Sequence, residues 1–80
     1  MKAHVYVTLK RTVLDAQGQT VADALRRMNY QGVIDVRQGK YFLLTLDGVD
    51  EAAARTEVER ISREVLVNPV IEEYSFLLEA

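Results

Sequence analysis

The segment from Val33 to Leu46, which reads VIDVRQGKYFLLTL, decides the fold of this chain. Its β-branched, aromatic and aliphatic residues are the types that suit the pleated, half-buried surface of a strand. Gly39 interrupts the apolar run and can adopt the backbone geometry of a tight turn or a bulge. The segment therefore predicts two strands folded about Gln38 and Gly39, or one long strand bent there. Arg37 and Lys40 place two cations at the bend.

A helix and a further strand are expected before this segment. Residues 3–9 alternate between apolar and polar side chains, which predicts a strand with one buried face. Asp15 precedes a helical pattern and is a good N-cap, because its carboxylate can accept backbone N–H bonds. Gly18 is a poor helix former, costing up to about 1 kcal/mol relative to Ala. Its place in the first turn indicates that another segment packs closely against the helix start.

A longer helix and a last strand are expected after the segment. The helix is predicted over residues 49–67, where Asn68 and Pro69 stop it. The last strand is predicted over residues 70–78. The inner stripe of the helix is predicted to be Ala54, Val58, Ile61 and Val65, and its favourable i,i+4 ion pairs to be Glu51–Arg55 and Glu59–Arg63.

These elements predict one α+β domain over residues 1–80, in the order β-α-β-β-α-β. That is the ferredoxin-like arrangement, a two-layer sandwich of an antiparallel sheet with both helices on one face. The last strand is expected at a sheet edge, although Phe76, Leu77 and Leu78 are apolar on both of its faces. An exposed apolar edge favours pairing with another chain. A chain this short also buries only about 60–65% of the surface that its unfolded form exposes. We therefore expect a homo-oligomer that associates through the sheet.

Composition excludes several classes of site. The chain has no Cys and a single His, so disulfides, thiolate zinc sites and multi-histidine metal sites are excluded. The net charge of −2 argues against nonspecific binding of nucleic acid, which needs a cationic face. No apolar run approaches the roughly 20 residues of a membrane span, and no signal peptide begins the chain. We expect a cytoplasmic protein that binds neither nucleic acid nor membrane.

The sequence contains no recognisable catalytic constellation. The two serines lie in no nucleophile motif, and His4 alone would have to act as the base. Glu72 and Glu73 are consecutive strand residues and point to opposite faces, so they do not easily serve one site. The residues predict a small α+β module that associates with other chains, with no catalytic residue and no metal site.

Several segments, read together, resemble a known family. They are V-T-L-K at residues 7–10, V-L-D-x-Q-G at residues 13–18, Ala24-Leu25, Gly32-Val33, V-R-x-G-K at residues 36–40 and N-P-V-I-E at residues 68–72. Their order and separation resemble the PurS family, the small subunit of the multi-subunit phosphoribosylformylglycinamidine synthase. The resemblance covers essentially the whole chain. It departs at Arg11-Thr12, where members often have Pro-Gly, and at Ala16, where they usually have Pro.

The resemblance implies a role in purine biosynthesis. The assembled enzyme of that family converts formylglycinamide ribonucleotide to formylglycinamidine ribonucleotide with ATP and glutamine. A PurL-type synthetase subunit carries the ATP-dependent chemistry, and a PurQ-type glutaminase subunit releases ammonia. The small subunit is non-catalytic, forms a dimer or a higher oligomer such as a tetramer, and bridges the other two. The resemblance therefore implies that this chain itself binds no cofactor.

The same resemblance supports a docking site at the bend and the start of the first helix. Its expected residues are Asp15, Gln17, Gly18, Arg37, Gly39 and Lys40; in the alternative reading they only shape a turn and an N-cap. We expect Tyr74, Phe76 and Leu78 to lie in the core or on a self-association surface. A different class with the same element order remains open at this point, a dimerising module of the ACT type that senses a small molecule.

Overall fold

The computed structural model describes all of residues 1–80. Three strands and two α-helices alternate along the chain, and a short π-helical turn follows the second helix. Their bounds are β1 Lys2–Leu9, α1 Ala16–Arg27, β2 Gly39–Thr45, α2 Glu51–Ile61, the π-helical turn Ser62–Leu66 and β3 Glu72–Glu79. The α+β class that the sequence predicts is confirmed.

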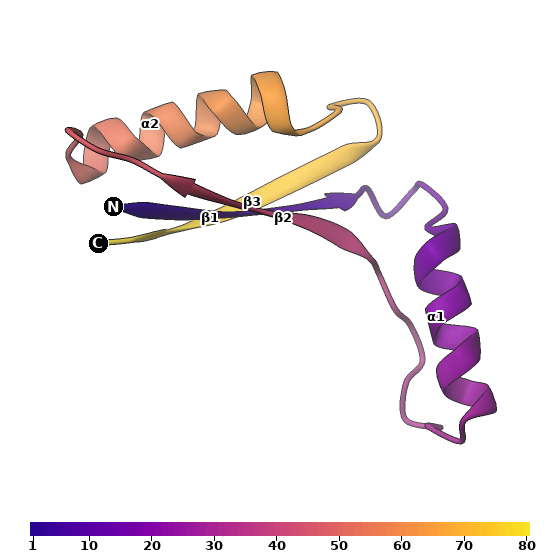
Figure 1. Cartoon of the computed structure of the whole chain (residues 1–80). Coiled ribbons are helices and arrows are strands. Elements are labelled where there is room, and N and C mark those ends of the chain that lie inside the picture. The colour runs from indigo at the N-terminus through magenta and orange to yellow at the C-terminus, as the bar shows by residue number, and fades with distance from the viewer.

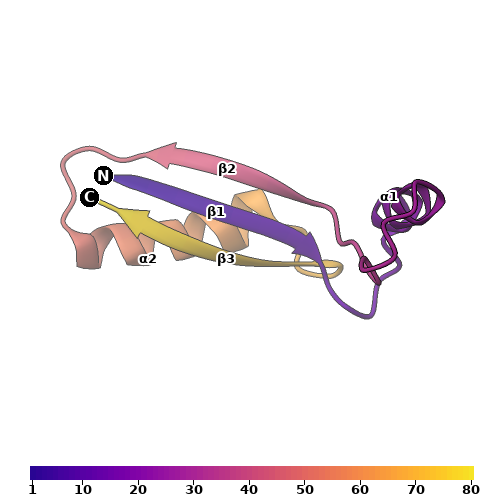
Figure 2. The same cartoon turned by 90° about the horizontal axis from the view of Figure 1, so that it is seen from below.

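The three strands form one antiparallel sheet in the order β2-β1-β3. Figure 2 shows β1 between its two partners, with the N- and C-termini at the same end of the sheet. Val5 lies opposite Phe42 on one side and opposite Phe76 on the other. The first and last strands are thus neighbours, and β3 lies at an edge of the sheet, as expected.

The core lies between one face of the sheet and α2 (Figure 1). The alternation of β1 places Ala3, Val5 and Val7 on this face, and all three are buried. Val58 on α2 packs among them. Complete burial of a valine side chain contributes about 1.5–3 kcal/mol relative to exposure. Only 10 of the 80 residues are buried, so this core is small and the strand at its centre carries much of it.

The second helix begins at Glu51, two residues after the predicted start, and its end also differs from the prediction. The Asp50 carboxylate accepts from the Ala53 N–H at 2.8 Å and caps α2. The expected inner stripe holds at Ala54 and Val58, but Val65 is 73% exposed and Ser62 is buried in its place. The wide turn explains this change, since the Val67 N–H bonds to the Ser62 carbonyl five residues back. Of the two predicted ion pairs only Glu51–Arg55 is present, at 3.6 Å.

The expectation that residues 33–38 form a strand is wrong for this chain. The strand begins at Gly39, which pairs with Thr8 near the end of β1, so β1 has almost no length left for residues 33–38 to pair with. Residues 31–38 instead return from α1 to the sheet without a partner strand. The antiparallel sheet and the alternation with helices hold, but one predicted strand is absent.

The expectation of two helices on one sheet face holds for α2 only. Figures 1 and 2 show α1 beyond the end of the sheet, where it gives the molecule its length of 49 Å. We call residues 16–38 the arm. Only Gly18 and Ala22 of α1 are buried, so this helix contributes little to the core. The exposed large apolar side chains on or beside the arm are those of Leu14, Val21, Met28, Tyr30 and Ile34.

Candidate docking site where the arm meets the sheet

Asp15 connects the start of α1 to the segment that returns to the sheet. Its Oδ1 accepts from the Gly18 N–H at 2.9 Å, and its Oδ2 accepts from the Gln38 N–H at 2.6 Å. The residue is only 5% exposed. The Gly18 N–H lowers the pKa of this carboxyl below its ordinary value, and the Gln38 N–H and the Arg37 charge add to that effect against the opposing effect of burial. Asp15 is therefore both the N-cap that the sequence predicts and a bridge to Gln38.

Gly18 is required where the two segments meet. A Cβ at this position would collide with the carbonyl oxygen of Val36 and lie 2.7 Å from the carboxylate of Asp15. The prediction that another segment packs against the helix start is confirmed, and that segment is the one around Val36. Glycine here allows an approach between backbones that alanine would prevent.

The Arg37 side chain bonds to the backbone of its own chain. Its Nη2 donates to the carbonyl oxygens of Lys10, Leu9 and Val13 at 3.1, 3.2 and 3.3 Å. These three carbonyls belong to the end of β1 and to the connection that leads to α1. The sequence placed Arg37 at the docking site as one of two cations at a bend. The structure gives it an additional intramolecular role.

Lys40 and Glu72 join the two edge strands across β1. The Lys40 Nζ lies 3.1 Å from a Glu72 carboxylate oxygen, and the other oxygen accepts from the Asn68 N–H at 2.7 Å. The Asn68 N–H and then the Lys40 ammonium lower the pKa of Glu72 below its ordinary value. Only about a tenth of the Glu72 side chain is exposed. This pair fixes the starts of β2 and β3 relative to each other.

A cavity of about 220 Å³ lies among these groups. The Gln38 side chain donates to Gln17 across it, at 2.9 Å. Of the six predicted docking residues, four line the cavity, and Gly18 and Arg37 adjoin it through their contacts with Asp15 and with the β1–α1 connection. Its lining residues are Val7, Thr8, Leu9, Asp15, Gln17, Gln38, Gly39, Lys40 and Glu72.

Sequence reasoning missed Gln38 and Glu72 as members of this site. Gln38 lies between two residues that were chosen, and its backbone N–H gives no sequence signal. Glu72 did give a sequence signal, because it lies two residues before Tyr74 and therefore on the same, core-facing side of the strand. A carboxylate at a core-facing strand position requires a partner, and Lys40 is that partner.

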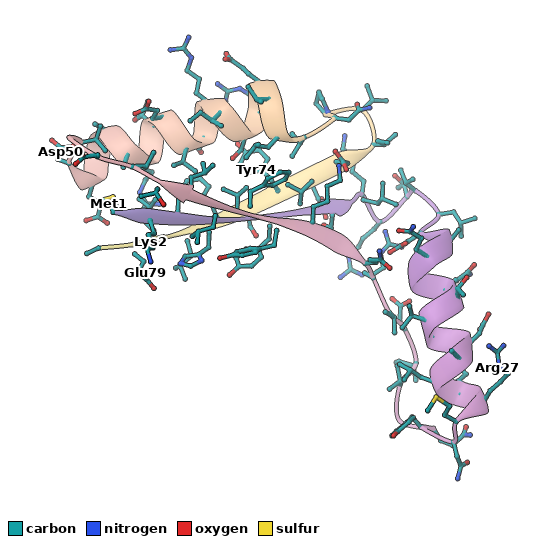
Figure 3. The ribbon with its side chains drawn as sticks, in the orientation of Figure 1. Met1, Lys2, Arg27, Asp50, Tyr74 and Glu79 are labelled. Atoms are coloured by element: carbon teal, nitrogen blue, oxygen red, sulfur yellow. The ribbon has the colours of Figure 1, made fainter.

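The three residues expected in the core or on a self-association surface face α2. Tyr74, Phe76 and Leu78 are partly buried and pack against the core, and Figure 3 shows Tyr74 on the α2 side of the sheet. Leu77, which points the other way, is 61% exposed. The structure therefore places those three residues in the core, and the exposed apolar side chain on β3 is that of Leu77.

The sheet face opposite α2 is uncovered, and we call it the open face. Tyr6 and Tyr41 lie there with their ring centroids 5.5 Å apart. His4 stacks on Tyr41, contacts its hydroxyl and lies 3.6 Å from the Glu79 carboxylate. The exposed large apolar side chains of the open face are Tyr6, Tyr41, Leu43 and Leu77.

The carboxylates of the site are held by neighbouring groups. Its carboxylates are engaged by backbone N–H groups and by Lys40, so none of them is held free beside a nucleophile. No group of three or more His, Cys, Asp or Glu side chains gathers to hold a metal ion. Neither helix is long and apolar enough to cross a membrane.

Comparison with known proteins identifies the family. The family model described as "PurS: Phosphoribosylformylglycinamidine (FGAM) synthase" matches residues 2–80. The PurS subunit of phosphoribosylformylglycinamidine synthase from Bacillus subtilis is 44% identical over 78 residues, which are 98% of this chain and 92% of that protein. The corresponding subunit from Synechocystis is 43% identical over 76 residues, 95% of this chain and 76% of that protein.

Solved structures agree with this assignment. A chain in the structure of PurLQS from Thermotoga maritima superposes with a TM-score of 0.86 at 32% identity, covering 95% of this chain and 93% of that one. The match of nearly the whole chain in sequence and in fold shows that the protein belongs to the PurS family of phosphoribosylformylglycinamidine synthase.

Proposed function

We propose that this chain is the small subunit of a phosphoribosylformylglycinamidine synthase in purine biosynthesis, where it bridges a PurL-type synthetase and a PurQ-type glutaminase. The likeness to a chain of the PurLQS structure carries this proposal, because it extends over almost the full length of both chains. The resemblance in the sequence and the comparisons point to the same family, PurS.

The chain's task in such a complex is positional. Ammonia released in one subunit is lost to water and to protonation unless its acceptor is near. A bridging subunit that holds the two sites together raises the effective concentration of the intermediate. In this proposal the other subunits use ATP and glutamine, this chain binds no cofactor and supplies no catalytic group, and the complex works in the cytoplasm.

Self-association is part of the proposal. The core contains few buried side chains, while the open face exposes Tyr6, Tyr41, Leu43 and Leu77. A second copy of the chain that covers this face removes apolar surface from water, at roughly 25 cal/mol for each Å². We propose a homo-oligomer, a dimer or a tetramer, that associates through the sheet.

Docking to the larger subunits is assigned to the end of the molecule where the arm meets the sheet. That end gathers polar side chains around a cavity, with Lys40 partly exposed at its rim. The six residues Asp15, Gln17, Gly18, Arg37, Gly39 and Lys40 either contact a partner or hold the surface that does.

Reconstitution tests the proposed function. The purified chain is mixed with a PurL-type synthetase and a PurQ-type glutaminase, and the mass of the complex and its glutamine-dependent synthase activity are measured. We expect one complex that contains all three chains, with glutamine-dependent activity that is lost when this chain is omitted. A chain that stays a lone monomer and associates with neither subunit would overturn the proposal. Saturable binding of a free amino acid by that lone chain would favour the ACT-type module instead.

A further inference from the structure

We propose that Arg37 and Asp15 are positioning residues that fix the orientation of the arm relative to the sheet. In this role they present the arm to a partner and do not themselves form the contact. The inference rests on the proposed bridging function, because a fixed direction matters only if the arm or the nearby surface docks.

Few contacts outside its base keep the arm in its orientation. Figures 1 and 2 show it extending beyond the sheet, and α1 makes no extensive contact with any strand or with α2. Two lengths of irregular chain, residues 10–15 and 28–38, connect α1 to the strands. Two such connections without further bonds would behave as a hinge.

The bonds between these two connections form a cluster that we call the junction. Arg37 donates to the carbonyls of Leu9, Lys10 and Val13, and Asp15 accepts from the Gln38 N–H. One connection thus supplies acceptor oxygens and a carboxylate, and the other supplies a guanidinium and an N–H. Because the junction joins the outgoing and the returning chain, it closes the base of the arm.

The close approach at Gly18 adds a steric constraint to these bonds. The Val36 carbonyl lies against the Cα of Gly18, so residue 36 cannot move toward the first turn of α1. The hydrogen bonds of Asp15 and Arg37 oppose movement away from it. The segment around Val36 can therefore move neither toward the first turn of α1 nor away from it.

Arg37 is a better positioning residue than a contact residue for a partner. One nitrogen of its guanidinium serves three carbonyls, and its positive charge helps to lower the pKa of Asp15. A partner that drew Arg37 away would break its hydrogen bonds to these three carbonyls, which is unfavourable. Lys40 differs, because its ammonium pairs with the Glu72 side chain and donates to no backbone carbonyl of the junction.

A distance measurement within one chain tests the junction directly. The chain lacks Cys, so Gln31→Cys on the arm and Thr45→Cys on β2 provide two exposed sites for spin labels. Doubly labelled chains are diluted into unlabelled chains, so that the distance measured by pulsed electron resonance lies within one molecule. We expect a narrow distance distribution in the otherwise unaltered chain. Arg37→Ala broadens it, and Arg37→Lys, which keeps the charge and the donors on a shorter side chain, restores it in part.

Asp15→Asn removes one bond and keeps another. The amide oxygen can still cap the Gly18 N–H, whereas the amide nitrogen cannot accept from Gln38. We therefore expect a broadened distribution with α1 intact by circular dichroism. Arg27→Ala is the matched control for charge, since Arg27 lies at the far end of α1 (Figure 3) and its side chain makes no hydrogen bond or ion pair. It leaves the distribution unchanged.

Assembly is the second measurement. If loss of the junction leaves the competent direction populated about one-tenth of the time, the apparent Kd for the partner subunits rises about tenfold. An unchanged distance distribution in Arg37→Ala would refute the positioning role, whatever happens to assembly. If the unaltered protein binds neither the synthetase nor the glutaminase, the proposed function is refuted. The distance measurements would still test whether the junction fixes the orientation of the arm.

Discussion

At the scale of single residues, Gly18 and Asp15 connect the start of α1 to a distant segment of the chain. Asp15 caps α1 and Gly18 lies in its first turn, and both contact a segment about 20 residues further along the chain. Asp15 would be an adequate N-cap with Gly18 alone, but the second bond to Gln38 makes it a tertiary contact. Gly18 costs helix propensity and is kept because a carbonyl occupies the place of its side chain.

The substitution Gly18→Ala is expected to destabilise the protein by about 1–3 kcal/mol, the usual cost of forcing extra volume into a packed site. Helix propensity alone predicts the opposite sign, a gain of about 1 kcal/mol. Urea unfolding followed by circular dichroism measures the difference. Gly32→Ala is the control, because nothing lies within 4 Å of a Cβ there and its φ is not positive. A stabilised Gly18→Ala variant would mean that Val36 does not approach α1.

Acid is expected to weaken the junction and the Lys40–Glu72 pair. The folded-state pKa values of Asp15 and Glu72 lie below their ordinary values of 3.8 and 4.5. Their contribution to stability is thus complete above those ordinary values, and it is lost as the pH falls through the lower folded-state pKa values. The free energy of unfolding, measured in urea from pH 7 to pH 3, should decline over the acid end of that range.

Two substitutions identify the groups responsible for this pH dependence. Asp15→Asn and Glu72→Gln each remove one titrating carboxyl, so each should flatten part of the acid decline. Asp23→Asn is the control, because Asp23 is exposed and pairs only with the neighbouring Arg26 on α1. An acid decline that is the same in all three variants would show that other carboxyls cause it.

At the scale of elements, β1 and α2 form the stable part and α1 stands apart from it. β1 pairs on both sides and places three small apolar side chains against α2. α2 ends in a π-helical turn, which rotates the helix end so that Leu66 and Val67 face the core and Val65 faces solvent. The same turn leaves the Ser62 hydroxyl buried without a hydrogen-bond partner.

Ser62→Ala is therefore expected to stabilise the protein, by about 1 kcal/mol, since an unsatisfied buried hydroxyl costs about 1–3 kcal/mol. The midpoint of urea unfolding measures the change. Ser75→Ala on the open face is the control and should stay within about 0.5 kcal/mol of the unaltered protein. A destabilised Ser62→Ala variant would show that the hydroxyl has a partner in solution.

The whole molecule is long and thin, measuring 49 × 27 × 13 Å. A body only 13 Å thick has a single layer of helix over part of one sheet face, and the other face stays uncovered. Its apolar side chains on the open face and on the arm explain why the family's small subunit is expected to work in an assembly.

Leu77→Lys on the open face should weaken self-association. Burial of a leucine contributes about 1.5–3 kcal/mol, so its loss corresponds to a rise of about tenfold or more in the dissociation constant. Sedimentation equilibrium over a range of concentrations measures this constant. Thr56→Lys adds the same charge on the exposed side of α2 and should leave the constant unchanged. Equal association by both variants would place the contact between copies elsewhere.

The sequence by itself determined the elements that depend on neighbours a few residues apart. The alternation in β1, the N-cap Asp15 and a helical segment that ends before Asn68 and Pro69 follow from local periodicity and hydrogen-bonding chemistry, and all appear in the structure. The segments that resemble the PurS family were equally readable, and the residues they supplied for the docking site gather around one cavity.

Only the tertiary structure decided where the segment 33–38 goes and what Arg37 does. The β-branched residues of segment 33–38 favour a strand. A strand forms only where a neighbour offers free N–H and C=O groups, and β1 ends too early to offer them. The sequence showed Arg37 only as a cation at the bend, because its acceptors are carbonyls 24 to 28 residues away. Backbone carbonyls are the same in every residue, so no pattern of side chains could have revealed them.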